Sequence, residues 1–431
     1  TYDVTTATTH TYDSLTFTNE ANIVSYGSSF YILSGTVNFD AIVGGTIQFD
    51  TLSLGTGFGT ASLNSGDPVQ VTNLIIGPGA IRGPSTVTVS TLLTWGGSYG
   101  TTSFIGPGVL NVNGDMTIES GGSIKRLDNR VLNNAGTATF LSRLRVDGSA
   151  AFNNLPSGVM DIQFDGELID GTVNNAGTMV KSAGTGTSTV RAHASNTGTV
   201  EVQAGVLELH TRYGSYYVQN AGQTRLNGGD LAFTKYGDPF DLQGGLLTGE
   251  GTITGDVANA GGSVEPGLSI GQLVIDGAYT QGPGGSYGVE LAGSLRGEYD
   301  TLVCTGNVSL AGDLNVVLIS GFEPEHGDIF QIVLGGLVTG EFESVSVTNL
   351  PPQMQVVVYY SPTTVTLIIP PLAGDCNEDY AVGLGDLVEF VPCLAGPEGG
   401  LGHDCDCADI DDDADVDLGD FAAFQAVFAG S

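Results

Sequence analysis

Carboxylates spaced two residues apart near the C-terminus are the residues with the clearest chemical potential. Such a spacing lets alternate side chains of a loop point inward, so that their oxygens converge on one hard cation. Two twelve-residue windows fit this pattern and predict two Ca²⁺ sites. The first set is Asp375, Asn377, Asp379, the Ala381 carbonyl, Gly383 through water, and Asp386. The second set is Asp409, Asp411, Asp413, the Asp415 carbonyl, Asp417 and Asp420.

Four cysteines lie in the same acidic segment, 375–431, which contains 15 acidic residues and no Lys or Arg. Such a cluster favours two disulfides and an oxidising compartment. The alternative is a zinc site. It is less favoured, because the segment has no C-x₂-C pair and only one nearby histidine, His403. Four cysteines allow three pairings, and the sequence does not choose among them. Cys304, far upstream, is expected to be a buried free thiol. The four clustered cysteines are Cys376, Cys393, Cys405 and Cys407.

A short helical stretch is expected after each loop, at 387–391 and 421–428, where Phe421, Phe424 and Phe428 share one face. The loop starts are 34 residues apart, and residues 382–387 match residues 416–421. This duplicated loop and helix resembles the type I dockerin, a calcium module that in its family docks onto a cohesin.

The segment departs from the dockerin pattern at several positions. Position 6 of the loops, normally Gly, is Tyr380 or Ala414, and Pro392 interrupts the first helix. Positions 10 and 11, which the family uses for cohesin recognition, are Leu-Gly in both halves. We therefore favour a cap stabilised by calcium and disulfides over a docking module.

Composition limits the rest of the chain. The 431 residues include 66 Gly, 41% are hydrophobic, and the net charge is −35. That hydrophobic content is enough for a large core, whereas 12 Lys and Arg are too few to make nucleic acid an expected partner. No apolar run is long enough for a membrane span, so no membrane insertion is expected. Abundant Gly, Thr, Val and Ser indicate an all-β chain with tight turns.

A repeat supports this interpretation. The motif Asn-Asn-Ala-Gly-Thr at 133–137 recurs at 174–178, with variants at 195–199, 219–223 and 258–262. The steps correspond to one or two units of roughly twenty residues. A strand repeat of this size cannot bury its apolar face alone, but stacked coils bury a continuous core. We therefore predict a parallel β-helix, a β-solenoid; the alternative is a β-sandwich with recurring turn chemistry.

The repeats resemble those of adhesin and autotransporter-passenger β-helices of bacterial surface proteins, over roughly residues 130 to 345. The resemblance implies a secreted β-helix, but such repeats serve adhesins, fibres and enzymes alike. The similar segments are 171–178, 198–202, 262–273, 279–281, 299–303 and 308–314.

The domain organisation follows from these patterns. We expect an N-terminal β-rich solenoid region at 1–130, β-helix repeats at 131–265 and the last β coils at 266–369. Residues 370–374 form the expected linker, and residues 375–431 form the dockerin-like module.

Two further groups of charged residues are candidate sites. Asp165 and Glu167 would face the same way on a strand and could cleave a polysaccharide, although alternating carboxylates are more often the solvated face of a strand. Five cations gather in 21 residues, and they could receive an acidic surface of a second copy; the alternative is ordinary surface charge. These cations are Lys125, Arg126, Arg130, Arg143 and Arg145.

No catalytic or organic-cofactor site is predicted, and the chain is not expected to be an enzyme. We expect a secreted protein of the cell surface or extracellular space whose leader has been removed, acting as the subunit of a homopolymer. The alternative is a secreted adhesin or carbohydrate-active protein, attached to a scaffold through its dockerin. A cohesin-like protein or a surface polysaccharide would then be the partner.

Overall fold

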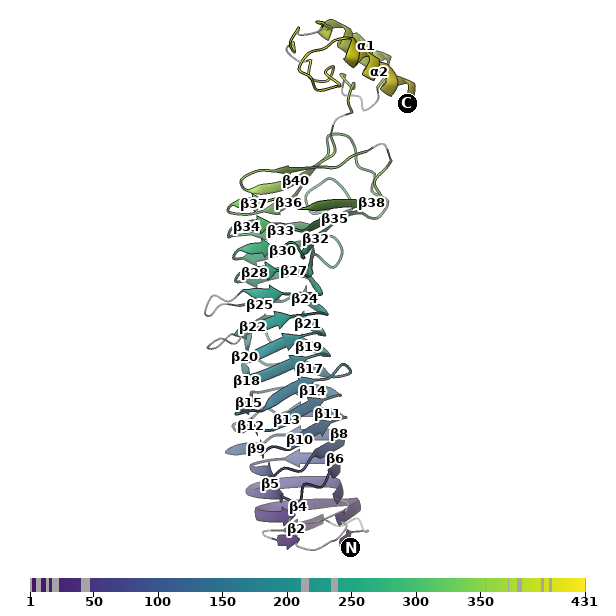
Figure 1. The fold of residues 1–431 in the computed structure, drawn as a ribbon. Helices are drawn as coiled ribbons and strands as arrows, with labels where there is room; N and C mark the ends of the chain where they lie inside the picture. The colour runs from purple at the N-terminus through teal and green to yellow at the C-terminus, as the bar shows by residue number, and fades with distance from the viewer. Residues whose placement is uncertain are drawn as a thin grey trace.

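Short strands with alternating burial follow one another around three sides of a β-solenoid (Figure 1). Inward-facing residues on β10 and β13, for example, alternate with partly exposed ones. Each strand pairs in parallel with its equivalent one coil later, as β10 with β13 and β11 with β14. The computed structural model describes residues 2–4, 9–12, 15–17, 23–39, 47–210, 217–233, 239–352, 354–370, 372–377, 382–396, 399–402 and 405–430.

Three stacks of strands form the sides of the solenoid. The first stack contains β10 (Val109–Val112), β13 (Val131–Asn134), β16 (Ala151–Asn154), β23 (Tyr217–Gln219), β26 (Phe240–Leu242), β28 (Val257–Asn259), β31 (Tyr279–Gln281), β34 (Val308–Leu310) and β37 (Val338–Gly340). The second contains β11 (Asp115–Ile118), β14 (Thr137–Phe140), β17 (Val159–Ile162), β19 (Thr178–Lys181), β21 (Thr199–Val202), β24 (Gln223–Asn227), β29 (Ser263–Pro266), β32 (Ser286–Leu291), β35 (Asp313–Leu318) and β38 (Ser344–Thr348). The third contains β7 (Gly79–Arg82), β9 (Thr101–Ile105), β12 (Ile124–Asp128), β15 (Leu144–Asp147), β22 (Val206–His210), β25 (Asp230–Ala232), β30 (Gln272–Asp276), β33 (Thr301–Cys304) and β36 (Ile329–Leu334).

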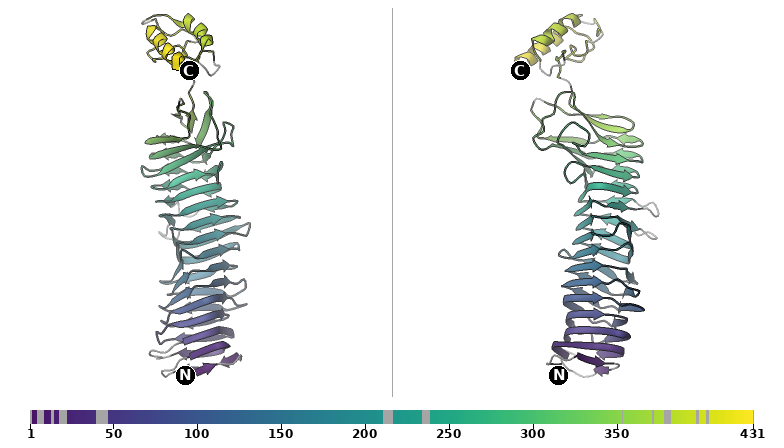
Figure 2. Two further views of the ribbon diagram at one scale, coloured as in Figure 1. Left: turned by 90° about the vertical axis from the view of Figure 1, so that its right-hand side faces the viewer. Right: turned by 180° about the vertical axis from the view of Figure 1, so that it is seen from behind.

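Longer strands continue around a corner and belong to more than one stack. They are β4 (Ile23–Phe39), β5 (Ile47–Leu63), β6 (Val69–Ile76), β8 (Val87–Trp95), β18 (Gly166–Asn175), β20 (Thr187–Asn196) and β27 (Leu246–Thr254). All the views in Figure 2 show these coils stacked along a single axis.

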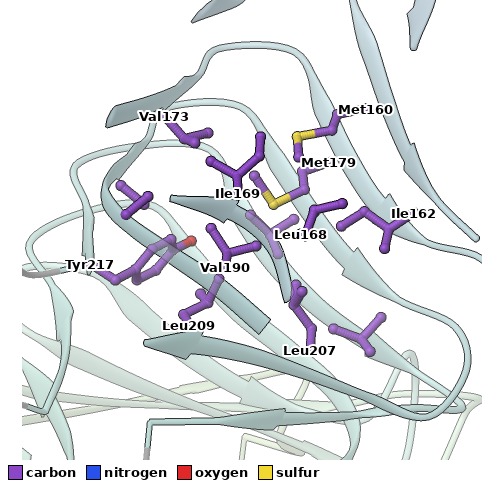
Figure 3. Packing of buried hydrophobic residues seen from close by; sticks show 14 of the residues in the cluster. Met160, Ile162, Leu168, Ile169, Val173, Met179, Val190, Leu207, Leu209 and Tyr217 are labelled. Carbon is purple, nitrogen blue, oxygen red and sulfur yellow. The ribbon is translucent and has the colours of Figure 1, made fainter. Parts of the chain in front are cut away.

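The core is one column of apolar side chains that runs along the inside of the stacked coils. Figure 3 shows part of it, where Met160 and Met179 come from successive coils and Leu168, Ile169 and Val190 fill the space beside them. Stacking therefore supplies the burial that a single coil lacks, as the repeat predicted.

Two ladders of side-chain amides run beside the core. Inside, Asn134 Nδ2 donates to Asn154 Oδ1 (2.9 Å), and the series continues through Asn175, Asn196 and Gln219 in steps of 20, 21, 21 and 23 residues. These inner amides are buried, so each bond satisfies a group that water does not reach.

The outer ladder uses the residue before each inner one. Asn133 Nδ2 donates back to Asn111 Oδ1 (2.9 Å), and Asn153 and Asn174 continue the series. The paired Asn-Asn motif thus places one amide inside the coil and one outside.

The two ends of the solenoid are built differently. At the N-terminal end, β1 (Tyr2–Val4), β2 (Thr9–Tyr12) and β3 (Leu15–Phe17) all pair in parallel with β4. At the C-terminal end, β40 (Thr364–Ile368) turns back antiparallel to β36 and also pairs with β39 (Val357–Tyr360). The helices follow: α1 (Leu384–Phe390), the 3₁₀ helix η1 (Val391–Cys393) and α2 (Leu418–Gly430).

The predicted parallel β-helix with a small helical segment is confirmed, but the phase of one repeat was wrong. The motif aligns Asn220 with the second asparagine of the other repeats, whereas the structure places Gln219 in the inner ladder. It also missed Asn154, which lies in the ladder although Leu155 and Pro156 replace the expected Ala-Gly.

Candidate metal centre in the acidic C-terminal segment

Asp386, the last residue of the first loop, ties the two ends of that loop together. Its Oδ1 accepts from the amide nitrogens of Cys376 (2.9 Å) and Asn377 (3.1 Å), and its Oδ2 accepts from that of Gly383 (2.6 Å). Asp386 is buried near the start of α1, where the helix dipole favours a negative charge. Two predicted ligands of this loop, Asp379 and Ala381, lie outside the described residues.

Asp420 makes the same three contacts in the second loop. Its Oδ1 accepts from the amide nitrogens of Ile410 (2.7 Å) and Asp411 (3.2 Å), and its Oδ2 accepts from that of Asp417 (2.8 Å). These donors occupy positions 2, 3 and 9 of the loop, as Cys376, Asn377 and Gly383 do in the first. The internal duplication of the sequence therefore extends to the geometry of the two carboxylates.

The second loop, whose predicted ligand residues are all described, gathers its acidic side chains. One carboxylate oxygen from each of Asp409, Asp411, Asp413 and Asp420 lies within 4.8 Å of the others, and Asp415, Asp417 and Asp420 form an overlapping group. The loop is already folded around Asp409, whose carboxylate accepts from the amides of Asp413 (3.1 Å) and Ala414 (3.0 Å).

Two residues of this loop adopt left-handed backbone angles. Asp412 has φ 63° and Ala414, at position 6, has φ 70°. Aspartate tolerates this region, whereas alanine costs about 1–2 kcal/mol there. The turn usually made by glycine is thus retained in the second loop; Tyr380, its counterpart, lies outside the described residues.

The electrostatics of the loops show opposing effects. Burial raises the pKa of Asp420 and of Asp386, but the backbone amide donors outweigh it, so both pKa values lie below the ordinary value. For Asp411, burial and the neighbouring carboxylates of Asp413 and Asp420 act together and raise the pKa. The second loop therefore holds mutually repelling carboxylates, an arrangement that a bound cation relieves.

The donor set of the second loop fits calcium. Its ligands would be carboxylate oxygens and one backbone carbonyl, and Ca²⁺ prefers six to eight hard oxygen ligands. A soft or nitrogen-preferring metal would find no suitable donor here, since the cysteine sulfurs are engaged elsewhere. The residues that would hold the ion are Asp409, Asp411, Asp413, Asp415, Asp417 and Asp420.

The four clustered cysteines form two disulfides, Cys376–Cys407 and Cys393–Cys405. Of the predicted alternatives, the disulfide interpretation is confirmed and zinc is not supported. Cys304 is a buried free thiol, as expected, and burial raises its pKa to about 12.

A small core links the two halves of the module. It includes Val382, Phe390, Val416 and Phe424, and the rings of Phe390 and Phe424 lie 4.9 Å apart. Phe428 is 41% exposed, so the predicted face of three phenylalanines is not buried throughout. Both helices begin inside the loops, three residues before the stretches predicted from sequence, because the loop-closing aspartates lie in their first turns.

Asp165 and Glu167 are engaged in ion pairs. Asp165 Oδ1 lies 3.1 Å from Lys181 Nζ, and Glu167 contacts Arg143 (2.6 Å) and Arg191. Both carboxylates contact cations of neighbouring coils and remain partly exposed, at 42% for Asp165 and 35% for Glu167, so they are paired groups on the solenoid surface.

The basic cluster is partly buried and partly paired within the chain, while the side chains of Arg126, Arg143 and Arg145 are 38%, 41% and 50% exposed. Lys125 and Arg130 are buried, Arg126 pairs with Asp128 and Asp147, and Arg145 pairs with Asp147. Acidic groups of the same chain thus neutralise much of the positive charge considered for a second copy.

Sequence reasoning placed Arg130 in a surface cluster and did not single out Lys181, whereas the structure buries both cations. Arg130 donates to the carbonyls of Ser85 (3.2 Å) and Gly83, two coils away, and Lys181 Nζ reaches Ser188 Oγ (2.9 Å). Burial lowers the pKa of Arg130 to about 10. The sequence around these two residues does not show that they are buried, because their inward orientation depends on the geometry of the coil.

A buried carboxylate was missed as well. Asp300 is 1% exposed and accepts from the amides of Gly271 (2.8 Å) and Glu290 (2.8 Å). Burial, together with the nearby carboxylates of Glu290 and Glu265, raises its pKa to about 7 against the effect of those hydrogen bonds. Asp300 lines a hollow of about 400 Å³ on the solenoid side, which Arg225 also lines.

No helix among the described residues is long and apolar enough to cross a membrane. Comparison with known proteins adds no relative: no protein-family model matches the chain, and no curated protein sequence matches it. Function must therefore be argued from the geometry.

Proposed function

We propose that this chain is an extracellular structural protein, a β-solenoid subunit of a cell-surface or extracellular homopolymer whose C-terminal module is stabilised by calcium. The observation that carries this proposal is the strand edge at each end of the solenoid. Within the described residues, β1, β2 and β3 pair only with β4, β38 pairs only with β35, and β39 pairs only with β40. Unpaired edges are templates for pairing with another chain.

The C-terminal end also exposes apolar side chains. Val345 on β38 is 43% exposed, and Tyr359 on the edge strand β39 is 58% exposed. Ile329, Val357 and Leu337 of the same end are similarly exposed. An apolar surface beside an open strand edge supports a contact surface for a second copy at this end.

The extracellular location is supported by the two disulfides, since such bonds persist in oxidising compartments. The acidic loops supply oxygen ligands suited to the millimolar calcium typical of extracellular modules. In this proposal calcium stabilises the module after the chain reaches the outside.

A second candidate is attachment to a scaffold protein through the module, as an adhesin or a carbohydrate-active protein. Leu384 and Leu418 occupy equivalent positions of the two halves and are 72% and 77% exposed, and Val388 is 69% exposed. Exposed leucines repeated by the duplication favour a protein partner, such as a cohesin-like domain. In this second candidate function, the ligand of the chain would be a surface polysaccharide.

The homopolymer is tested by placing charge on the C-terminal end. Val345→Lys and Tyr359→Lys should abolish assembly of the purified chain, measured by sedimentation velocity and light scattering. The matched control is Ile124→Lys, because Ile124 is 52% exposed on β12, in the middle of the solenoid and many coils from that end. A chain that stays monomeric without any substitution would reject the homopolymer, and capture of a cohesin-like domain would favour the second candidate.

A further inference from the structure

Both disulfides end in one short segment directly before the second loop. Cys405 is joined to Cys393, and Cys407 is joined to Cys376. Cys407 also accepts a hydrogen bond through its carbonyl from the amide of Gly374 (3.2 Å). A single short segment thus connects to both ends of the first loop and helix.

The Cys376–Cys407 bridge reaches the start of each calcium loop. Asp375, the first predicted ligand of loop one, lies between Gly374 and Cys376, and both neighbours are fastened to Cys407. Asp409, the first predicted ligand of loop two, follows Cys407 by two residues. Moreover, the amide of Cys376 donates to the loop-closing carboxylate of Asp386 (2.9 Å).

The second bridge holds the other side of the module. Cys393 ends η1, and Cys405 lies four residues before the second loop. Close to it, Val416 O inside that loop accepts from the amides of Ala395 (3.0 Å) and Gly396 (3.2 Å). The bridge and these bonds fix the end of the first helical segment against the second loop.

We propose that the two disulfides preorganise the second loop and the described ends of the first, so that the redox state of the module sets its calcium affinity and bound calcium in turn protects the bridges from reduction. This inference rests on the proposed calcium sites. The bridges close separations of 31 and 12 residues and thereby restrict the open chain. They also hold together carboxylates that repel one another. The entropic cost of ordering the loop on calcium binding is therefore smaller.

The redox step is a simple exchange. Reducing each bridge takes two electrons and two protons from an external dithiol, which leaves as its own disulfide, and produces two cysteine thiols. Because both equilibria share one cycle, the ratio of calcium affinities in the oxidised and reduced chains equals the ratio of the bridge reduction constants without and with calcium.

The test measures both ratios on the full chain. Calcium titration by calorimetry is performed before and after reduction, and bridge reduction in a dithiol buffer is followed by thiol trapping and mass spectrometry, in calcium and in chelator. We expect tighter calcium binding in the oxidised chain by about 5–150-fold, the usual range of coupling between sites. The bridge reduction constant should fall in calcium by the same factor.

Variants assign the effect to a bridge. Replacing Cys376 and Cys407 together by serine should weaken calcium binding, whereas Cys304→Ser, in the solenoid, should leave it unchanged. If the double variant does not fold, the coupling is still tested in the native chain by the ratio of calcium affinities and the ratio of bridge reduction constants. Equal calcium affinity in both redox states would overturn the coupling and leave the calcium sites standing; no calcium binding in either state would overturn both.

Discussion

Asp386 and Asp420 are buried carboxylates that close their loops through backbone amides. Each accepts three such hydrogen bonds from equivalent positions, and these donors hold both pKa values low. A carboxylate satisfied in this way fixes the loop ends and leaves about one lone-pair site for a cation. Hydrogen bonds within the chain therefore fix the ends of both loops at the positions where calcium would bind.

Replacing one of these carboxylates should remove one calcium site. Asp420→Asn keeps the shape but loses the charge and one acceptor oxygen, so we expect bound calcium to fall from two ions per chain to one. Calorimetric titration measures the stoichiometry. Glu389→Gln is the matched control, because Glu389 is an exposed acid on α1 outside the predicted ligand set. Two ions retained by Asp420→Asn would contradict the assignment.

Asp300 should make the stability of the solenoid depend on pH. Its folded pKa of about 7 lies above the ordinary 3.8, so between these values the folded chain holds a proton that the unfolded chain has released. The contribution of Asp300 is therefore full below about pH 3.8 and is lost as the pH rises through 7. Glu265 and Glu290, which line the same hollow, contribute to the raised pKa of Asp300.

The comparison is with Asp300→Asn, which cannot titrate. The urea midpoint of the native chain should fall relative to that of Asp300→Asn as the pH is raised from 5 to 8. A difference that stays constant over this range would show that Asp300 is ionised throughout.

The inner asparagine ladder is the element that joins successive coils beside the apolar core. Asn154 accepts from Asn134 and donates to Asn175, and it also donates to the carbonyls of Gly158 and Thr178. Removing it leaves several buried groups without partners, whereas the outer Asn153 lies where water can replace its bonds.

We therefore expect Asn154→Ala to destabilise the coils around β16 by about 1–3 kcal/mol. Asn153→Ala, its neighbour in the outer ladder, should cost less than about 1 kcal/mol. Hydrogen exchange of the strands from β13 to β20 measures both, because solenoids open locally. Equal losses for the two variants would show that the inner amides have no special role.

Sequence patterns predicted the coil but not its details. The Asn-Asn-Ala-Gly motif marked a repeat because asparagine recurs where coils stack. The shift from Asn220 to Gln219 escaped detection, since glutamine can replace asparagine in a ladder without keeping the motif. The burial of Arg130 and Lys181 was not predictable, because it depends on the folded coil: Arg130 bonds to a carbonyl two coils away, and Lys181 bonds to Ser188 on the next side of the coil.

In the acidic C-terminal segment, the expected disulfides and short helices are present, whereas calcium binding stays a prediction. Ligand types at fixed spacing and an internal duplication both describe local structure, which depends little on distant contacts. The pairing of the cysteines could not be predicted from the sequence, since all three connectivities fit the spacing. The predicted helices also began too late in the sequence. The backbone is already helical at Asp386 and Asp420, which the ligand spacing alone does not show.

On the scale of the whole molecule, the charge of −35 opposes association of identical chains. Salt screens such repulsion, so assembly should increase between low and physiological ionic strength. Light scattering against salt concentration checks this, with the Val345→Lys chain as the control for the C-terminal end. Assembly that weakens with added salt would point instead to contacts made by ion pairs.

Electron microscopy of the purified chain, in calcium and after chelation, tests the central claim most directly. We predict fibres or sheets in which solenoids are joined end to end, and their loss on chelation if the calcium-stabilised module takes part in the contact. Fibres that persist in chelator would keep the homopolymer and restrict the module to a cap. A monodisperse monomer in both conditions would contradict the account.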